Sequence, residues 1–152
     1  MADFNHIGWP SSIGISGRLG AESPAELLKF SKCHPYYTQK LGYFVFESAV
    51  EEVSIEDITT GIQEVFADSR PYFEALIRAL PPQQRMVLRA IANEPTDKVM
   101  AKEYIRKHAL GSTSAITLAL KQLSAQDHIE ENNGVWSVVD PIFGKWIIGM
   151  YR

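Results

Sequence analysis

The dipeptide Asn133-Gly134 constrains the fold of this chain more than any other short stretch. It lies within the run HIEENNGVWSVVD, residues 128–140, where apolar and polar residues alternate on both sides. Asn-Gly is the strongest local signal for a two-residue hairpin turn, because both residues accept the positive φ angles that the turn requires. The sequence therefore predicts a β-hairpin that turns at Asn133-Gly134.

Three amphipathic stretches precede this hairpin, and one follows it. Their apolar spacing predicts helices at 83–92, 100–109 and 113–126, and a last helix at 141–150. We expect Ser112 or Thr113 to cap the third helix and Gly111 to end the second. The residues expected in the core are Met86, Val87, Leu88, Ile91, Ile116, Leu120 and Leu123. Three helices and a hairpin have the order of a winged helix-turn-helix, with a tetrahelical or unrelated α+β domain as the alternative.

The N-terminal half shows helical patterns and no strand pattern. We expect helices at 23–33, 35–50, 55–68 and 71–80, with starts indicated by Ser23-Pro24, Pro35, Ser54 and Pro71. A proline disfavours the helical conformation of the residue before it, so one helix should end at Cys33-His34 and the next begin at Pro35. The expected apolar faces contain Tyr36, Leu41, Phe44 and Val45, then Ile55, Ile58, Ile62, Val65 and Phe66.

These elements predict a mainly α protein, in which a small helical bundle precedes a winged helix-turn-helix with a hairpin wing. The expected parts are a loop, disordered tail or added segment at 1–22, a helical domain at 23–80 and the winged helix at 81–152. Residues 1–80 carry 6 basic and 11 acidic side chains, net −5, whereas residues 81–152 carry 9 and 7, net +2. The C-terminal part therefore permits nucleic-acid binding without having a strongly basic character.

Composition excludes several other classes of protein. The chain of 152 residues is 45% hydrophobic and 22% charged, which is typical of a soluble globular protein. No apolar run is long enough to cross a bilayer and the N-terminus lacks a signal-peptide pattern, so we expect a cytoplasmic protein without a membrane partner. The single cysteine, Cys33, and four scattered histidines have no metal-ligand spacing, so no metal site is expected.

Two stretches resemble the C-terminal region of archaeal-type ATPases of the AAA+/STAND group. The run KCHPYYTQKLGYFVFE, residues 32–47, is similar to the Gly-His-Pro-Tyr-Tyr-x-Gln segment of the lid domain in those ATPases. The runs LPPQQRMVLRAIA and SAITLALKQLSAQDHIEENNGVWSVVDPIFGKWI resemble the winged helix that follows the lid. The resemblance covers residues 23–148, and it implies that this chain is the C-terminal regulatory part of such an ATPase.

The resemblance also implies a nucleotide contact in the lid. Pro35 occupies the place of the proline that lies against the adenine, so the implied contact residues are His34, Pro35 and Tyr36. The chain departs from the lid pattern at Cys33, where these ATPases carry a glycine that allows a close approach of the backbone.

A second departure from the family lies in the winged-helix part. Asp140 stands at the place of a nucleotide-sensing aspartate that follows a histidine in some relatives, but here the preceding residue is Val139. An aspartate before a proline also has the pattern of a helix N-cap, and that role explains Asp140 without any nucleotide.

The sequence itself offers no catalytic machinery. It contains no Gly-x-x-x-x-Gly-Lys-Ser/Thr motif and no strand that ends in paired acidic residues, so phosphates and magnesium have no predicted site. His34 and His128 lack a nearby nucleophile or carboxylate pair in any recognisable pattern. We therefore expect no catalytic residue and no cofactor for this chain, while ATP and magnesium would belong to the parent ATPase, whose N-terminal core is an implied partner.

Duplex DNA and a protein are the two alternative partners of the winged helix. The cations available for phosphates are Lys98, Lys102, Arg106, Lys107 and Lys121. The reading helix contains no arginine, and Glu130 and Glu131 place negative charge on the wing. These features predict weak, phosphate-based binding, with a protein-interaction module or a stand-alone DNA-binding regulator as alternatives.

Overall fold

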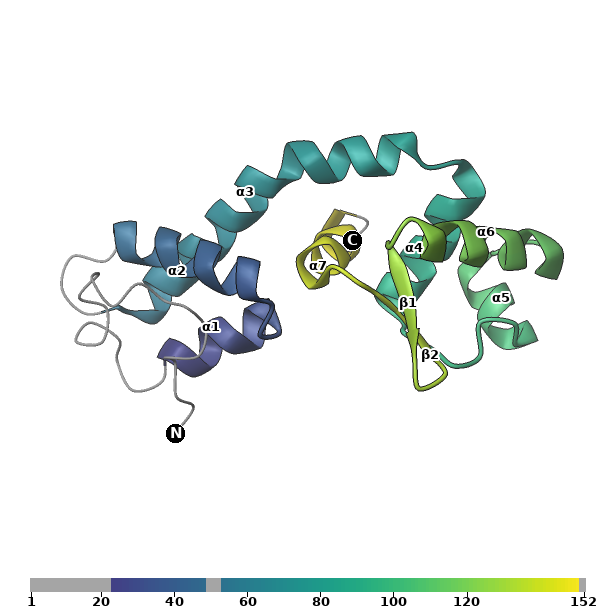
Figure 1. Ribbon diagram of the computed structural model, residues 1–152, viewed down its shortest axis with the longest axis horizontal. Coiled ribbons are helices and arrows are strands. Elements are labelled where there is room, and N and C mark those ends of the chain that lie inside the picture. Colours follow the sequence, from purple (N-terminus) through teal and green to yellow (C-terminus); the bar gives the residue numbers. More distant parts are fainter. Residues whose placement is uncertain (1–22, 49–52, 151–152) are drawn as a thin grey trace. The chain divides into compact units, whose positions relative to one another are not determined.

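The computed structural model describes residues 23–48 and 53–150, most of which are helical (Figure 1). The elements are α1 (Ser23–Ser31), α2 (Pro35–Ser48), α3 (Ile55–Ala79), α4 (Pro82–Asn93), α5 (Lys102–His108), α6 (Thr113–Ala125), β1 (Ile129–Asn132), β2 (Val135–Val138) and α7 (Pro141–Met150). The predicted fold class, mainly helical with a hairpin after three helices, is confirmed. The tail expected at 1–22 lies outside the described residues, and so do the side chains of the cap expected at Ser23-Pro24.

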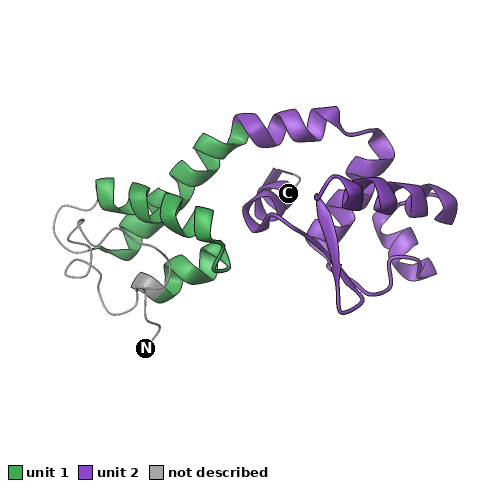
Figure 2. Cartoon of the chain, in the orientation of Figure 1, with its two compact units in different colours: residues 1–70 green, residues 71–152 purple. Residues whose placement is uncertain are grey.

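The chain divides into two compact units, residues 1–70 and 71–152 (Figure 2). The division falls within α3, between Arg70 and Pro71. Each unit has buried apolar side chains of its own, and each is described by itself below.

In the first unit, a sharp turn joins α1 to α2. Lys32 and Cys33 both have positive φ angles, 50° and 59°, and α2 begins at Pro35 as predicted. The hydroxyls of Ser31 and Thr38 lie 2.7 Å apart in the interior and connect the two helices across the turn. The left-handed pair ends α1 at Ser31, two residues before the predicted end, because it turns the chain away from the helix axis.

The buried face of α2 differs by one residue from the prediction. Tyr37, Leu41 and Val45 are buried at a spacing of four, whereas Tyr36, which the sequence pattern places on the apolar face, is 57% exposed. Gly61 of α3 packs closely on this face, because a Cβ atom there would lie 2.6 Å from Cγ2 of Val45. A glycine is thus needed where these two helices approach.

The helices predicted at 55–68 and 71–80 are a single helix, so this prediction was wrong. Ser54 caps α3 as predicted: its hydroxyl accepts from the amide of Asp57 at 3.2 Å, and the Asp57 carboxylate accepts from the amide of Ser54. Pro71 removes one helical hydrogen bond, yet the buried positions keep a spacing of three or four across it, which a continuous helix satisfies. They are Ile58, Gly61, Val65, Ser69, Phe73 and Ile77. Ile55, predicted to be buried, is 68% exposed.

The second unit packs α4, α6 and α7 around a common apolar core. The predicted core residues Val87, Leu88, Ile91, Ile116, Leu120 and Leu123 are buried, whereas Met86 is 39% exposed. Phe73, in the part of α3 that belongs to this unit, lies 5.0 Å from the ring of Phe143 and 5.5 Å from that of Trp146. Asp140 caps α7, since its carboxylate accepts from the amides of Ile142 and Phe143 at 2.9 Å each.

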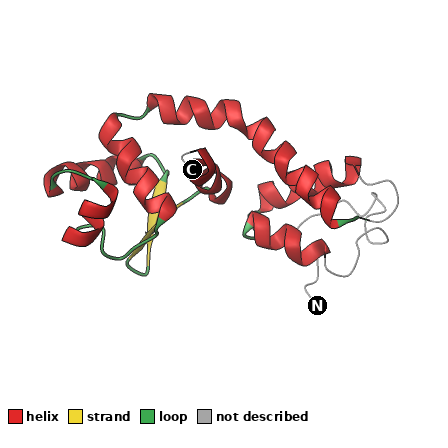
Figure 3. Cartoon of the chain, turned by 180° about the vertical axis from the view of Figure 1, so that it is seen from behind, coloured by secondary structure: helices red, strands yellow, loops and turns green. Residues whose placement is uncertain are grey.

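The wing is a hairpin with a third, single-residue partner. β1 and β2 form an antiparallel hairpin (Figure 3), in which Asn132 stands opposite Val135. Asn133 and Gly134 have the positive φ angles of the predicted turn. Thr96, between α4 and α5, exchanges two backbone hydrogen bonds with Trp136 of β2. The sequence does not predict this pairing, because one residue has no detectable strand pattern.

Candidate functional site

The candidate nucleic-acid site is the pair α5 and α6, which a tight turn connects. Ala109 and Gly111 have φ angles of 52° and 79°, and the amide of Leu110 donates to the carbonyl of Ile105 at 3.0 Å. Leu110 is fully buried, and its carbonyl accepts from Nε2 of Gln83 on α4 at 2.6 Å. These contacts fix the direction in which the chain leaves α5.

The start of α6 has the cap that the sequence predicts. The hydroxyl of Ser112 accepts from the amide of Ala115 at 3.4 Å. This hydrogen bond satisfies one of the amides that the first turn of a helix leaves without a partner, so α6 begins at a defined residue.

Four of the five predicted DNA-contacting cations are exposed and have no ion-pair partner in the described part of the chain. Lys102 and Arg106 lie one turn apart on the same face of α5, with Lys98 in the segment before it and Lys121 on α6. The fifth, Lys107, has a partner, because its Nζ lies 2.6 Å from the carboxylate of Glu94. The structure thus separates Lys107 from the other four in its electrostatic surroundings.

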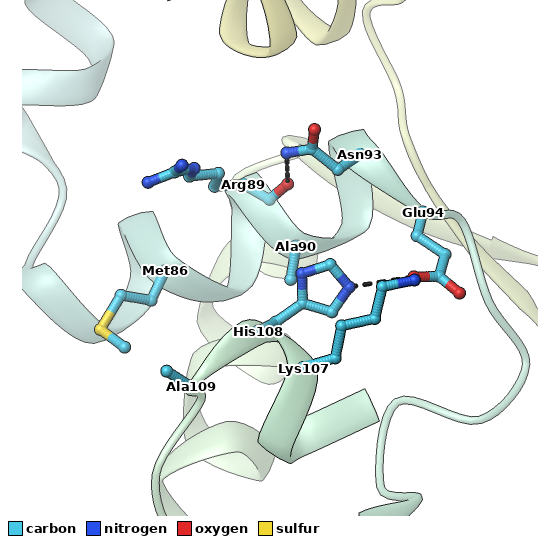
Figure 4. A pocket seen from close by; sticks show the side chains of 8 residues that line it. All are labelled: Met86, Arg89, Ala90, Asn93, Glu94, Lys107, His108 and Ala109. Carbon is cyan, nitrogen blue, oxygen red and sulfur yellow. Dashed lines mark hydrogen bonds and ion pairs between the residues drawn. The ribbon is translucent and has the colours of Figure 1, made fainter. Parts of the chain in front are cut away.

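Glu94, directly after α4, binds three residues of α5. Its carboxylate accepts from Lys107 and lies 3.1 Å from Nε2 of His108 (Figure 4). Its backbone carbonyl accepts from the hydroxyl of Tyr104 at 2.9 Å. The hydrogen bonds from Lys107 and His108 lower the pKa of the Glu94 carboxyl below its usual value. Burial raises the pKa of Tyr104, so its hydroxyl stays a protonated donor. The sequence does not reveal this cluster, because its members are 10 to 14 residues apart.

An open pocket of about 560 Å³ lies beside this cluster, between α4 and the end of α5. Its walls combine the polar groups of Glu94, Lys107 and His108 with the smaller apolar side chains of Ala90 and Ala109 (Figure 4). The carboxylate within it is already neutralised by Lys107. The cluster is therefore suited to hold α5 against α4, and the lowered pKa of the Glu94 carboxyl makes it a weak base.

The exposed face of α6 presents few groups that could read bases. The hydroxyl of Thr117 donates to the carbonyl of Thr113 at 2.9 Å, within the helix. The amide oxygen of Gln122 accepts from Nε2 of Gln84 at 2.7 Å. These side chains are therefore engaged within the protein.

The wing carries negative charge at its surface. Glu130 and Glu131 of β1 are both exposed. A wing that contacts phosphates would need cations at such positions, and carboxylates are repelled by the DNA backbone. The strand β1 contains no lysine or arginine that could contact a phosphate.

In the first unit, the consecutive residues His34, Pro35 and Tyr36 lie at the start of α2, and the side chains of all three are exposed. Lys40 supports Tyr36: its Nζ lies 3.3 Å from the Tyr36 hydroxyl and also pairs with Asp68. Burial acts to lower the pKa of Lys40, but the hydrogen bonds from Lys40 to Asp68 and Tyr36 raise it above its usual value. Lys40 thus stays charged and holds the Tyr36 ring at the surface.

The second unit matches a known family. A family model described as a probable winged helix domain covers residues 71–149, just over half of the chain. This chain belongs to that family. The match agrees with the helix order of the second unit and with its hairpin. The bridge between Thr96 and Trp136 adds one residue pair to that hairpin.

Neither the curated proteins nor the solved structures gave a significant match to the chain. The family description names no ATPase, and the match does not extend to residues 23–70. Within the described ranges 23–48 and 53–150, no helix is long and apolar enough to span a membrane and no group of three metal-binding side chains occurs.

Proposed function

We propose that the winged helix of this chain binds duplex DNA, mainly through phosphates. The observation that carries this proposal is the set of exposed cations on and before α5 and on α6 that no carboxylate of the described residues neutralises: Lys98, Lys102, Arg106 and Lys121. In helix-turn-helix domains the helix before the reading helix crosses the DNA backbone, which is the place that α5 would take. The proposed function is thus binding of DNA without a chemical reaction.

Phosphate contact is favoured over base recognition by the composition of α6 and the wing. α6 contains one cation, Lys121, and no arginine, which is the residue best suited to guanine. The acidic wing residues Glu130 and Glu131 would be repelled by the backbone, so the wing should contribute little. The expected affinity is therefore low and strongly dependent on salt.

The test is a titration of a fluorescently labelled random duplex with the full chain, at several salt concentrations. Each phosphate contact contributes about −0.9 to the slope of log affinity against log salt concentration. If all four cations contact phosphates, this slope should be about −3.6. Replacement of Lys102 and Arg106 with alanine should weaken binding equally on every sequence and make the slope shallower by about 1.8.

Lys107→Ala is the matched control, because it removes a cation from the same helix that is already paired with Glu94. It should weaken binding much less than the double replacement does. Absence of binding at low salt, or binding that the double replacement leaves unchanged, would contradict the proposal. The same exposed helix surface would then be assigned to a protein partner.

A second candidate function concerns the first unit, and one observation favours it. Cys33 stands at the glycine of the ATPase lid pattern, and its φ angle of 59° is a conformation that favours glycine. The left-handed turn is formed in this chain without glycine, and His34, Pro35 and Tyr36 are exposed directly after it, at the start of α2. We propose that this surface is one wall of a nucleotide site whose other walls belong to an ATPase core.

This proposal predicts weak nucleotide binding and no hydrolysis by the chain itself. Photo-crosslinking with an azido-adenine nucleotide, followed by peptide mapping, should label residues around Tyr36. Tyr36→Ala should reduce the labelling, whereas Tyr43→Ala, which removes an equally exposed tyrosine from the same helix, should not. Labelling that is unaffected by Tyr36→Ala, or is equal for both variants, would oppose the proposal.

A further inference from the structure

The exposed face of α6 has a leucine at its centre. Leu118 is 56% exposed, although most other apolar residues of the helix are buried. Positions three and four residues away lie on the same side of a helix, so Ser114, Lys121 and Gln122 surround it. This is the face that a helix-turn-helix domain presents to the major groove.

The polar neighbours of Leu118 are largely occupied by contacts within the protein. A glutamine that recognises adenine uses its amide oxygen and nitrogen together, but the oxygen of Gln122 already accepts from Gln84 at 2.7 Å. The hydroxyl of Thr117 donates to the carbonyl of Thr113. Base recognition by Gln122 or Thr117 would compete with these hydrogen bonds, whereas the apolar side chain of Leu118 can contact a base while both are kept.

We propose that Leu118 is a specificity-determining residue that contacts the C5-methyl group of thymine in the major groove. The proposal rests on the duplex binding proposed above. The thymine methyl is the one apolar group that a base pair presents in the major groove. A leucine held over a G·C pair would instead cover polar groups without replacing their hydrogen bonds to water, which is unfavourable.

The charge of the same face supports a nucleic acid as the occupant. Lys121 lies three residues after Leu118 and has no ion-pair partner in the described segments, and the same holds for Lys102 and Arg106 on α5. Cations on both helices would bring α6 to a duplex without selecting a sequence, and Leu118 would add a preference for thymine. No acidic residue lies within α6 to oppose this approach.

The test compares two duplexes of one A·T-rich sequence, one with thymine and one with deoxyuridine at every thymine position. This exchange removes the C5-methyl groups and leaves the charge and the Watson–Crick hydrogen bonds unchanged. The full chain should bind the deoxyuridine duplex about fourfold more weakly for each methyl group that Leu118 covers, because burial of one such group contributes about 0.8 kcal/mol. Leu118→Ala should bind both duplexes equally.

Met86→Ala is the matched control, because it truncates an exposed apolar side chain of the same unit outside α6. It should keep the preference for thymine. Equal binding of the two duplexes by the unaltered chain would overturn the role of Leu118, and so would a preference that persists in Leu118→Ala. Failure to bind either duplex at low salt would instead overturn the proposed DNA-binding function, so the two failures are distinct.

Discussion

The side-chain amides of Gln84 and Gln122 join α4 to α6, with Nε2 of Gln84 donating to Oε1 of Gln122 at 2.7 Å. Gln84 is 5% exposed, and its own amide oxygen is buried without a partner in the described part of the chain. One hydrogen bond is thus gained while one acceptor is left unsatisfied.

The first prediction follows from this imbalance. Gln84→Met removes the unsatisfied oxygen at similar volume, and it should raise the free energy of unfolding by about 1 kcal/mol, because the exposed Gln122 can bind water instead. Gln122→Met should lower the free energy by about 1 to 3 kcal/mol, since it leaves the whole Gln84 amide buried and unpaired. Urea denaturation followed by circular dichroism measures both. Two changes of the same sign would contradict this explanation.

The second prediction concerns the turn before α2. Cys33→Gly should stabilise the chain by about 0.5 kcal/mol. Glycine removes the free-energy cost of a left-handed conformation, and this gain slightly exceeds the larger entropy that glycine loses on folding. Cys33→Ala keeps a Cβ atom and should change little. Destabilisation by glycine, measured by urea denaturation, would show that the thiol makes a contribution the turn geometry does not reveal.

The third prediction concerns Pro71 within α3. Pro71→Ala should restore one helical hydrogen bond and raise the free energy of unfolding by about 1 to 2 kcal/mol. This figure is a net gain, because alanine also gives the unfolded chain more conformational freedom, which offsets part of the effect. The helical circular dichroism signal should not fall. Pro82→Ala is the control, because a proline at the start of α4 removes no helical hydrogen bond. Loss of stability in Pro71→Ala would argue against a continuous helix.

The fourth prediction is a pH dependence that arises from Glu94. Its pKa is lowered in the folded chain by Lys107 and His108, so the stability that it contributes is complete above the usual carboxyl value of 4.5. That contribution is lost as the pH falls through the lower folded value. The stability difference between the native chain and Glu94→Gln should therefore be complete at about pH 5 and shrink toward about pH 3. A difference that grows as the pH falls below 4.5 would contradict the assigned pairing.

Local signals in the sequence determined where most elements begin and turn. Pro35, Ser54, Ser112 and Asp140 start their helices through proline geometry or capping hydrogen bonds, and Asn133-Gly134 forms the predicted turn. These features depend on atoms within a few residues, so a single sequence is enough to identify them. The helix order and the winged helix-turn-helix assignment followed from the same signals.

Only the tertiary structure decided which side chains are buried, which charges are paired and whether α3 is continuous. Tyr37 is buried and Tyr36 exposed, although a helical spacing alone allows either. Lys107 is neutralised by Glu94 from outside its own helix, whereas Lys102, five residues earlier, has no such partner among the residues described. These outcomes depend on segments far apart in sequence, because burial and ion pairing are properties of the surfaces that meet when the chain is packed.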